Sequence, residues 1–143
     1  MRKFVLFLVL LLLLLPGGSV FSYTNDSEIQ TLARFVSGEA ADCDYFVQTA
    51  IAAVVLNRVK STSFPDSIAS VIYQPGAFEV ADQGRISDRV SVNSSIYNAC
   101  LDAVNGADPT NGALYFYNTE AVNNRPALSQ NVIKSIGRYS FTK

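Results

Sequence analysis

Apolar residues recur at three- and four-residue intervals in the first polar part of the chain, at Ile29, Leu32, Ala33 and Val36. This spacing predicts an amphipathic helix with Asp26 or Ser27 as its N-cap and Gly38 close to its end. The segment from Tyr45 to Val59 is instead apolar on nearly every face. Helices of that kind are usually buried, so we expect this one to be the central helix of the domain, capped by Asp44.

Shorter segments follow, separated by turn residues. Asp66 can cap a short helix that ends near Tyr73. Residues 77–91 are polar and predict an irregular loop, whereas residues 93–106 have helical spacing and end at a glycine.

The C-terminal part predicts a small β element. Residues 113–117 are rich in aromatic side chains, which favours a strand, and residues 139–141 predict a second strand that pairs with it. Residues 129–136 predict a last short helix. The pattern therefore indicates one α+β domain, mainly α, over residues 23–143.

The N-terminal segment has the layout of a secretory signal peptide. Arg2 and Lys3 precede an apolar run from Phe4 to Leu15, which is too short to span a bilayer as a helix. Small residues follow, and we expect cleavage after Ser22 and a protein that is secreted, periplasmic or in the cell wall. The alternative is an uncleaved N-terminal tether.

The amino-acid composition limits which partners the chain can bind and which kinds of catalytic or metal site it can form. Without Arg2 and Lys3, nine basic residues face twelve acidic ones, so neither nucleic acid nor an anionic membrane is an expected partner. The chain has no histidine, which excludes a Ser-His-Asp catalytic triad and a typical His-ligated zinc site. We expect no cofactor and no metal, and acid–base chemistry must come from Asp, Glu, Tyr or Lys.

Two cysteines remain, Cys43 and Cys100. An even count in an exported protein favours one disulfide, which would contribute about 4 kcal/mol on the chain-entropy model. The alternative is two free buried thiols.

One carboxylate has a position suited to catalysis. Glu39 follows the apolar face of the first predicted helix and precedes the buried one. Partial burial and the negative end of a helix both disfavour ionisation. A carboxyl group kept protonated near neutral pH can protonate a glycosidic oxygen, although a solvated surface glutamate would give the same pattern.

Four blocks, in order, resemble the cell wall hydrolase family named after the spore cortex-lytic enzyme SleB, which also includes CwlJ. Together they cover about residues 28–141. They are Leu32-Ala33-Arg34 with Gly38-Glu39-Ala40, then residues 50–59, then Phe64-Pro65 with residues 71–78, and finally Asp108-Pro109-Thr110 with residues 112–118.

The resemblance implies a lysozyme-like fold, related to lytic transglycosylases, and an enzyme that cleaves the β-1,4 bond between N-acetylmuramic acid and N-acetylglucosamine in peptidoglycan. It places the catalytic glutamate at Glu39. We expect a monomer whose sugar-binding groove is lined by Gln74, Phe78, Tyr115, Tyr117 and Asn118. Arg58 is interpreted as a structural charge. Glu79 and Asp82 are candidates for a second carboxylate only in a true hydrolase.

The chain departs from the family pattern in two places. Residues 41–44 replace an Arg-Gly-Glu-Pro-like stretch, and Gly137-Arg138-Tyr139 replaces a Gly-Asn-His-like end. These departures motivate an alternative in which the protein binds peptidoglycan, or acts as an inhibitor-like protein, without cutting it. A further alternative is a metal-dependent enzyme that uses Asp42 and Asp44.

Overall fold

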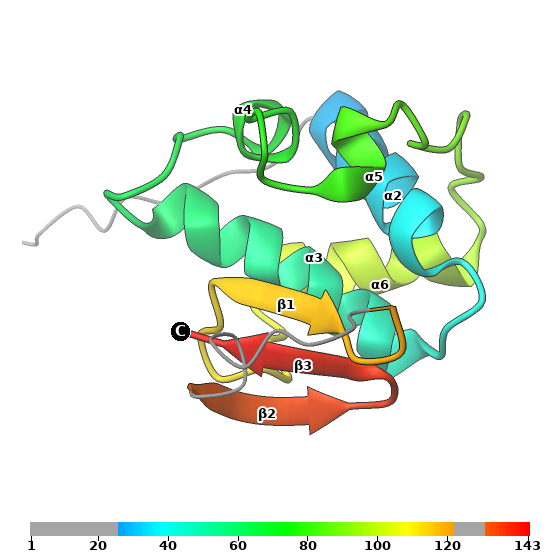
Figure 1. Cartoon of the computed structure of the whole chain (residues 1–143). Helices are drawn as coiled ribbons and strands as arrows, with labels where there is room; N and C mark the ends of the chain where they lie inside the picture. The colour runs from blue at the N-terminus through cyan, green and yellow to red at the C-terminus, as the bar shows by residue number, and fades with distance from the viewer. Residues whose placement is uncertain (1–25, 122–130) are drawn as a thin grey trace, which may run out of the picture.

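The structure, a computed structural model, describes residues 26–121 and 131–143. Five helices and a three-stranded sheet make up this part of the chain (Figure 1). The expected signal segment lies outside the described residues. Within them, no helix has both the length and the apolar character needed to cross a membrane.

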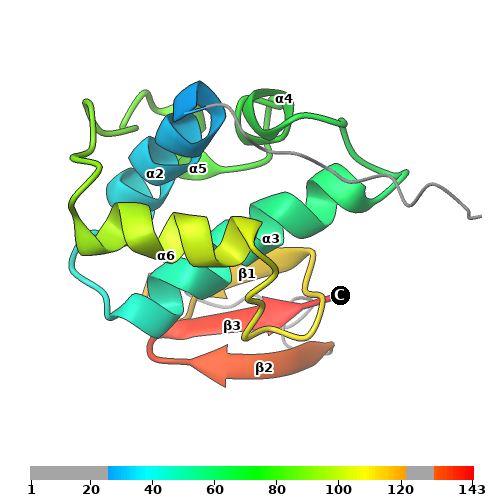
Figure 2. The same ribbon diagram turned by 180° about the vertical axis from the view of Figure 1, so that it is seen from behind.

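Helix α3, Tyr45–Lys60, is the centre of the domain. Asp44 caps it, with its side chain accepting a hydrogen bond from the backbone N–H of Val47 at 3.0 Å. Its neighbours are α2 (Asp26–Ala40), α4 (Ile68–Ile72) and α6 (Ser95–Val104). The apolar faces of these helices bury α3 on almost all sides, as its composition predicted. Figure 2, the view from behind, shows α6 lying across α3.

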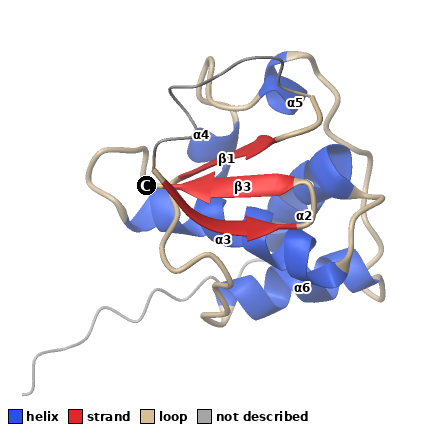
Figure 3. Ribbon diagram, turned by 60° about the horizontal axis from the view of Figure 1, so that its bottom comes forward, coloured by secondary structure: helices blue, strands red, loops and turns tan. Residues whose placement is uncertain are grey.

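The sheet packs along the other side of α3 (Figure 3). Its strands are β1 (Tyr115–Asn118), β2 (Val132–Ile136) and β3 (Tyr139–Thr142), in the antiparallel order β1-β3-β2. The predicted pairing of the two aromatic strands is confirmed, with Phe116 opposite Phe141 and Asn118 opposite Tyr139.

Three local predictions were wrong. The expected helix over residues 129–136 is strand β2 where the structure describes it, because Gly137 (φ 56°) and Arg138 form a two-residue turn that folds this segment back onto β3. Within the expected loop at 77–91 lies a short helix, α5 (Glu79–Asp82). The cap of α4 is Ser67 rather than Asp66.

The expected disulfide is also absent, since both cysteines are free. Cys100 is fully buried on α6. The thiol of Cys43 lies in the α2–α3 loop and hydrogen-bonds to the carboxylate of Asp42 at 3.8 Å. Cys43 is directed at this loop carboxylate and Cys100 packs into the core. The two cysteines are therefore not bonded to each other, although their even number had favoured a disulfide.

Candidate active site

Glu39 lies in the last turn of α2 and not just beyond it. The loop that follows is fixed by the buried side chain of Gln48, whose amide donates hydrogen bonds to the carbonyls of Ala40 and Cys43, both at 3.1 Å. These contacts satisfy carbonyl groups at the helix end and hold the chain next to Glu39. The carboxylate is therefore carried by a rigid part of the backbone.

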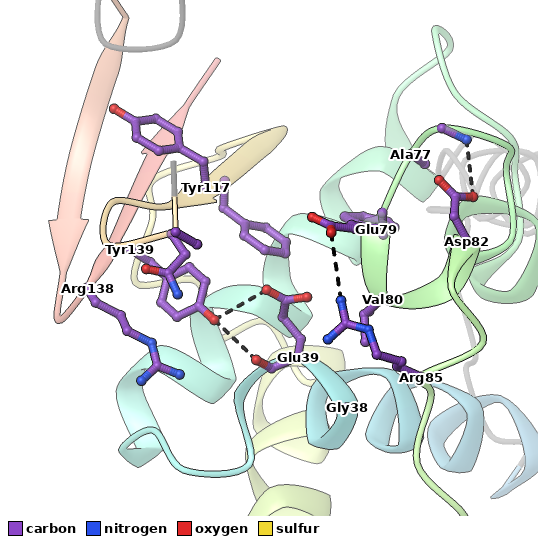
Figure 4. A pocket seen from close by; sticks show the side chains of 15 residues that line it. Gly38, Glu39, Ala77, Glu79, Val80, Asp82, Arg85, Tyr117, Arg138 and Tyr139 are labelled. Carbon is purple, nitrogen blue, oxygen red and sulfur yellow. Dashed lines mark hydrogen bonds and ion pairs between the residues drawn. The ribbon is translucent and has the colours of Figure 1, made fainter. Parts of the chain in front are cut away.

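The hydroxyl of Tyr139 reaches Glu39 from the sheet. It lies 3.2 Å from the backbone oxygen of Glu39 and 3.3 Å from Oε1 and can donate to either. The Tyr139 ring is buried against Phe116 at a centroid distance of 5.7 Å. Since its ring is held by the core, its hydroxyl fixes the direction of the Glu39 side chain (Figure 4).

Burial raises the pKa of Glu39 above its ordinary value, as the sequence predicted. The hydrogen bond from Tyr139 and the charges of Arg85 and Arg138 act in the opposite direction, whereas the charge of Glu79 adds to the increase. Removal of the carboxylate from water is the largest of these effects. The proton is thus retained to a higher pH than on an exposed glutamate.

A cleft of about 790 Å³ opens in front of this carboxylate. One wall is the segment around α5, and the other is the end of β1 with the β2–β3 turn (Figure 4). The lining residues are Gly38, Glu39, Gly76, Ala77, Phe78, Glu79, Val80, Asp82, Arg85, Phe116, Tyr117, Asn118, Ala121, Arg138 and Tyr139. Both charged or polar side chains and aromatic rings line the cleft, a combination that suits a sugar chain.

The expected groove residues divide into two groups. Phe78, Tyr117 and Asn118 line the cleft beside Glu39. Gln74 is exposed on the preceding turn, and Tyr115 packs against Phe64; neither belongs to the cleft lining.

The α5 wall approaches the helix that carries Glu39 very closely. A Cβ atom at Gly38 would lie 2.5 Å from the backbone oxygen of Arg85 and 3.2 Å from the Cα of Ile86. Helix α2 ends at Ala40, close to Gly38 as the sequence predicted, and the glycine itself allows two pieces of backbone to touch. Ser87 adds to this contact, because its N–H donates to the carbonyl of Arg34 at 3.2 Å.

The other wall is joined to the α2–α3 loop by a bidentate ion pair. The guanidinium of Arg138 donates to both oxygens of Asp42, at 2.8 and 3.0 Å. These two residues belong to the two segments in which the chain departs from the family pattern. The departures are thus structurally coupled, and together they hold the turn before Tyr139 against the loop after Glu39.

The carboxylates of the metal-dependent alternative have other contacts. Asp42 pairs with Arg138, and Asp44 caps α3. The described residues contain no group of three or more His, Cys, Asp or Glu side chains that could hold a metal ion.

Tyr139 and Arg138 were not predicted as site residues. Their proximity to Glu39 depends on contacts between positions about one hundred residues apart, for which local periodicity carries no signal. The one available signal was the predicted pairing of the terminal strand with β1, since Asn118 and Tyr139 are register partners.

A helical bundle beside a small antiparallel sheet, with one half-buried glutamate in the cleft between them, defines a lysozyme-like domain of the lytic transglycosylase type. The chain belongs to the Cell Wall Hydrolase family, whose model matches residues 44–142.

Similar proteins agree with this placement. The chain is 39% identical over 127 residues to a spore cortex-lytic enzyme of Bacillus cereus and 41% identical over 127 residues to one of Bacillus subtilis. Each alignment covers 89% of this chain, and so includes Glu39, although the family-model match begins at Asp44. The chain spans 48% and 39% of the length of these two curated relatives.

Two solved structures resemble the domain at 38% sequence identity. The catalytic domain of the Bacillus cereus SleB protein has a TM-score of 0.77, with 90% of this chain and all of that chain covered. The catalytic domain of germination-specific lytic transglycosylase SleB from Bacillus anthracis has a TM-score of 0.75, with 85% of this chain and 98% of that chain covered.

Proposed function

We propose that this protein cleaves the glycan strand of peptidoglycan at the β-1,4 bond between N-acetylmuramic acid and N-acetylglucosamine, as a lytic transglycosylase or muramidase. The observation that carries the proposal is the environment of Glu39. Its carboxyl group is half-buried, has a raised pKa and is directed by Tyr139 at the edge of an open polar cleft. The cortex-lytic and lytic transglycosylase names of its relatives support the same substrate.

Glu39 acts first as an acid and then as a base. Its proton passes to the glycosidic oxygen as the bond to the muramic anomeric carbon breaks, and the substrate's acetamido group stabilises the positive charge that develops. The carboxylate then takes the proton of the muramic 6-hydroxyl as that oxygen attacks the anomeric carbon. The product is a 1,6-anhydro end, whereas attack by water would give ordinary hydrolysis.

The other acidic residues of the cleft favour the single-glutamate route. Glu79 is exposed and lies 4.0 Å from the Arg85 guanidinium, and Asp82, nearby on α5, is exposed as well. Neither is a buried carboxylate held by hydrogen bonds in the way that Glu39 is. A group that must activate water from a fixed position needs such support, so we assign the chemistry to Glu39 alone.

The remaining roles follow from position. Phe78, Tyr117 and Asn118 contact the sugars next to the cleaved bond, the rings by stacking and the amide by hydrogen bonds to acetamido groups. Gln74 remains a candidate at the rim of the groove. We infer that residues 1–22 direct export, that residues 23–143 form the catalytic domain, and that it works as a monomer in the periplasm, the wall or the medium.

Digestion of purified sacculi tests the proposal. The wild-type chain should release soluble muropeptides with anhydro ends detectable by mass spectrometry, and Glu39→Gln should lower the rate by at least about a hundredfold. Glu79→Gln is the matched control, because it changes a carboxylate of the same cleft in the same way, and it should retain most of the activity.

If Glu39→Gln releases products as fast as the wild-type chain, Glu39 is not the catalytic acid and base. The rival function, a non-catalytic wall-binding or inhibitor-like protein, predicts that the wild-type chain sediments with sacculi but releases neither reducing nor anhydro ends.

A further inference from the structure

A buried arginine, Arg58, is enclosed by aromatic rings, one of which, Phe78, also lines the cleft. Arg58, near the end of α3, is 4% exposed, and its Nε donates to the carbonyl of Leu114 at 2.7 Å. The centre of its guanidinium lies 4.9, 4.5 and 5.1 Å from the ring centroids of Phe64, Phe78 and Tyr115. We call these three rings and Arg58 the arginine cage.

The charge of Arg58 has no carboxylate partner in the described part of the chain. The two arginines of the cleft do have one, since Arg85 pairs with Glu79 and Arg138 with Asp42. Three cation–π contacts offset part of the cost of burying a guanidinium, but a buried charge is usually also matched by an opposite charge. The contacts within the fold thus leave the cage with a net positive charge.

The terminal nitrogens of Arg58 are not completely enclosed, although the side chain as a whole is buried. Among the described residues, Arg138 Nε is the one side-chain nitrogen or oxygen that is fully buried without a hydrogen-bond partner. The terminal nitrogens of Arg58, which have no described hydrogen-bond partner, must therefore touch solvent. The cage presents a small cationic opening bordered by Tyr115, which is 44% exposed.

The cage adjoins the catalytic cleft. The ring of Phe78 packs on Arg58 and also lines the cleft with Glu39. Tyr115 precedes Tyr117 by two residues on β1, so both side chains lie on one face of the strand, about 7 Å apart. That separation is of the order of one sugar ring along a glycan.

We propose that the arginine cage is an anion subsite that binds a carboxylate of the substrate while the glycan lies across Glu39. The inference rests on the proposed function, since it takes peptidoglycan as the ligand. Every second sugar of that polymer is a muramic acid, whose lactyl group carries either a free carboxylate or a peptide that ends in one. The planar guanidinium binds such a group through its terminal nitrogens, and Phe64 and Tyr115 contact the adjoining sugar.

Binding measured without turnover tests the cage independently of catalysis. The full chain carrying Glu39→Gln is titrated calorimetrically with a soluble tetrasaccharide muropeptide and with the same fragment after its carboxylates are converted to carboxamides. We expect amidation to weaken binding about tenfold or more, as loss of a charge-assisted hydrogen-bonded pair does. Adding Arg58→Gln should weaken binding of the acidic fragment by a similar factor and remove the difference between the fragments.

Lys60→Gln is the matched control, because it removes a positive charge from the same helix end at an exposed position. It should leave the discrimination between the fragments intact. Tyr115→Ala provides a variant that does not disturb the core, and it should weaken binding of both fragments.

Equal affinity of the Glu39→Gln chain for the two fragments would overturn the proposal, and this comparison needs no change at Arg58. So would discrimination that survives Arg58→Gln. Either result leaves the assignment of Glu39 untouched, because that assignment is judged by product release.

Discussion

Alanine at Gly38 would push the α5 wall away from the helix that carries Glu39. Alanine in place of glycine inside a helix normally stabilises a protein by about 0.5–1 kcal/mol, because it restricts the unfolded chain. At Gly38 the new methyl group would lie 2.5 Å from the backbone oxygen of Arg85 and 3.3 Å from a methyl group of Val80. Because backbone cannot rotate away as a side chain can, helix α2 and the backbone at Arg85 must move apart by nearly an ångström.

Overpacking of this kind costs about 1–3 kcal/mol. After the gain in helix propensity, the net destabilisation by Gly38→Ala is roughly 0–2.5 kcal/mol, and its central value of about 1 kcal/mol is equivalent to a midpoint lower by about 4 °C in a domain of this size. Activity should fall as well, because the displaced segment carries Phe78 and Glu79 on the far side of the cleft. Thermal unfolding followed by circular dichroism measures the first effect, and muropeptide release at 25 °C the second.

Gly106→Ala separates the two effects. Gly106 has a φ of 108°, and a Cβ atom added there would meet nothing within 4 Å. The residue follows the end of α6, outside the cleft lining. Its substitution should destabilise the fold through backbone strain but leave the activity of the folded protein unchanged. If Gly38→Ala raises the midpoint and retains full activity, the close approach is not what this glycine provides.

Three further outcomes follow from contacts outside this region. Tyr139→Phe removes the hydrogen bond that lowers the pKa of Glu39, so the alkaline limb of the pH–rate profile should move to higher pH. A shift to lower pH would contradict the assignment of Glu39 as the acid that Tyr139 contacts. Iodoacetamide without reductant should label Cys43 in the native protein and Cys100 only after denaturation, because burial raises the pKa of Cys100 to about 12. If neither cysteine is labelled in either state, the two form a disulfide. Asp108→Ala should cost about 2–4 kcal/mol in urea denaturation. Its carboxylate accepts three hydrogen bonds from the loop before β1 and one from Asn57 on α3, and a change below about 0.5 kcal/mol would refute its structural role.

The helices and the position of Glu39 were predictable because they depend on local periodicity and caps. Asp44 caps α3 as the sequence predicted, and α6 begins within the segment for which helical spacing was predicted, with Ser94 as its cap. Strand β2 was not predictable, because its residues are exposed at nearly every position and show no alternation. It is a strand because the Gly137 turn pairs it with β3, whose four residues are all buried.

The residues of the candidate site were predictable only where they belong to motifs that can be recognised along the chain. Glu39 and Phe78 belong to motifs that can be found along the chain, whereas Tyr139 reaches Glu39 across one hundred residues. Arg58 was interpreted as a structural charge because it ends a buried helix, and the sequence could not reveal that the rings around it come from three separate segments. Long-range contacts therefore account for what local reasoning missed.

The absence of histidine and the identity of Tyr139 together simplify the chemistry of the site. Burial and the nearby charge of Glu39 raise the pKa of Tyr139 well above its ordinary range, so its hydroxyl stays a neutral donor wherever the enzyme works. A histidine in contact with the carboxylate would titrate in the same pH range as Glu39 and change the charge beside it during the reaction. In the proposed mechanism, Glu39 gives one proton to the leaving oxygen and takes another from the muramic 6-hydroxyl, and a tyrosine at this position leaves both exchanges between Glu39 and the substrate. The hydrogen bond then stabilises the carboxylate between the two steps without competing for its proton.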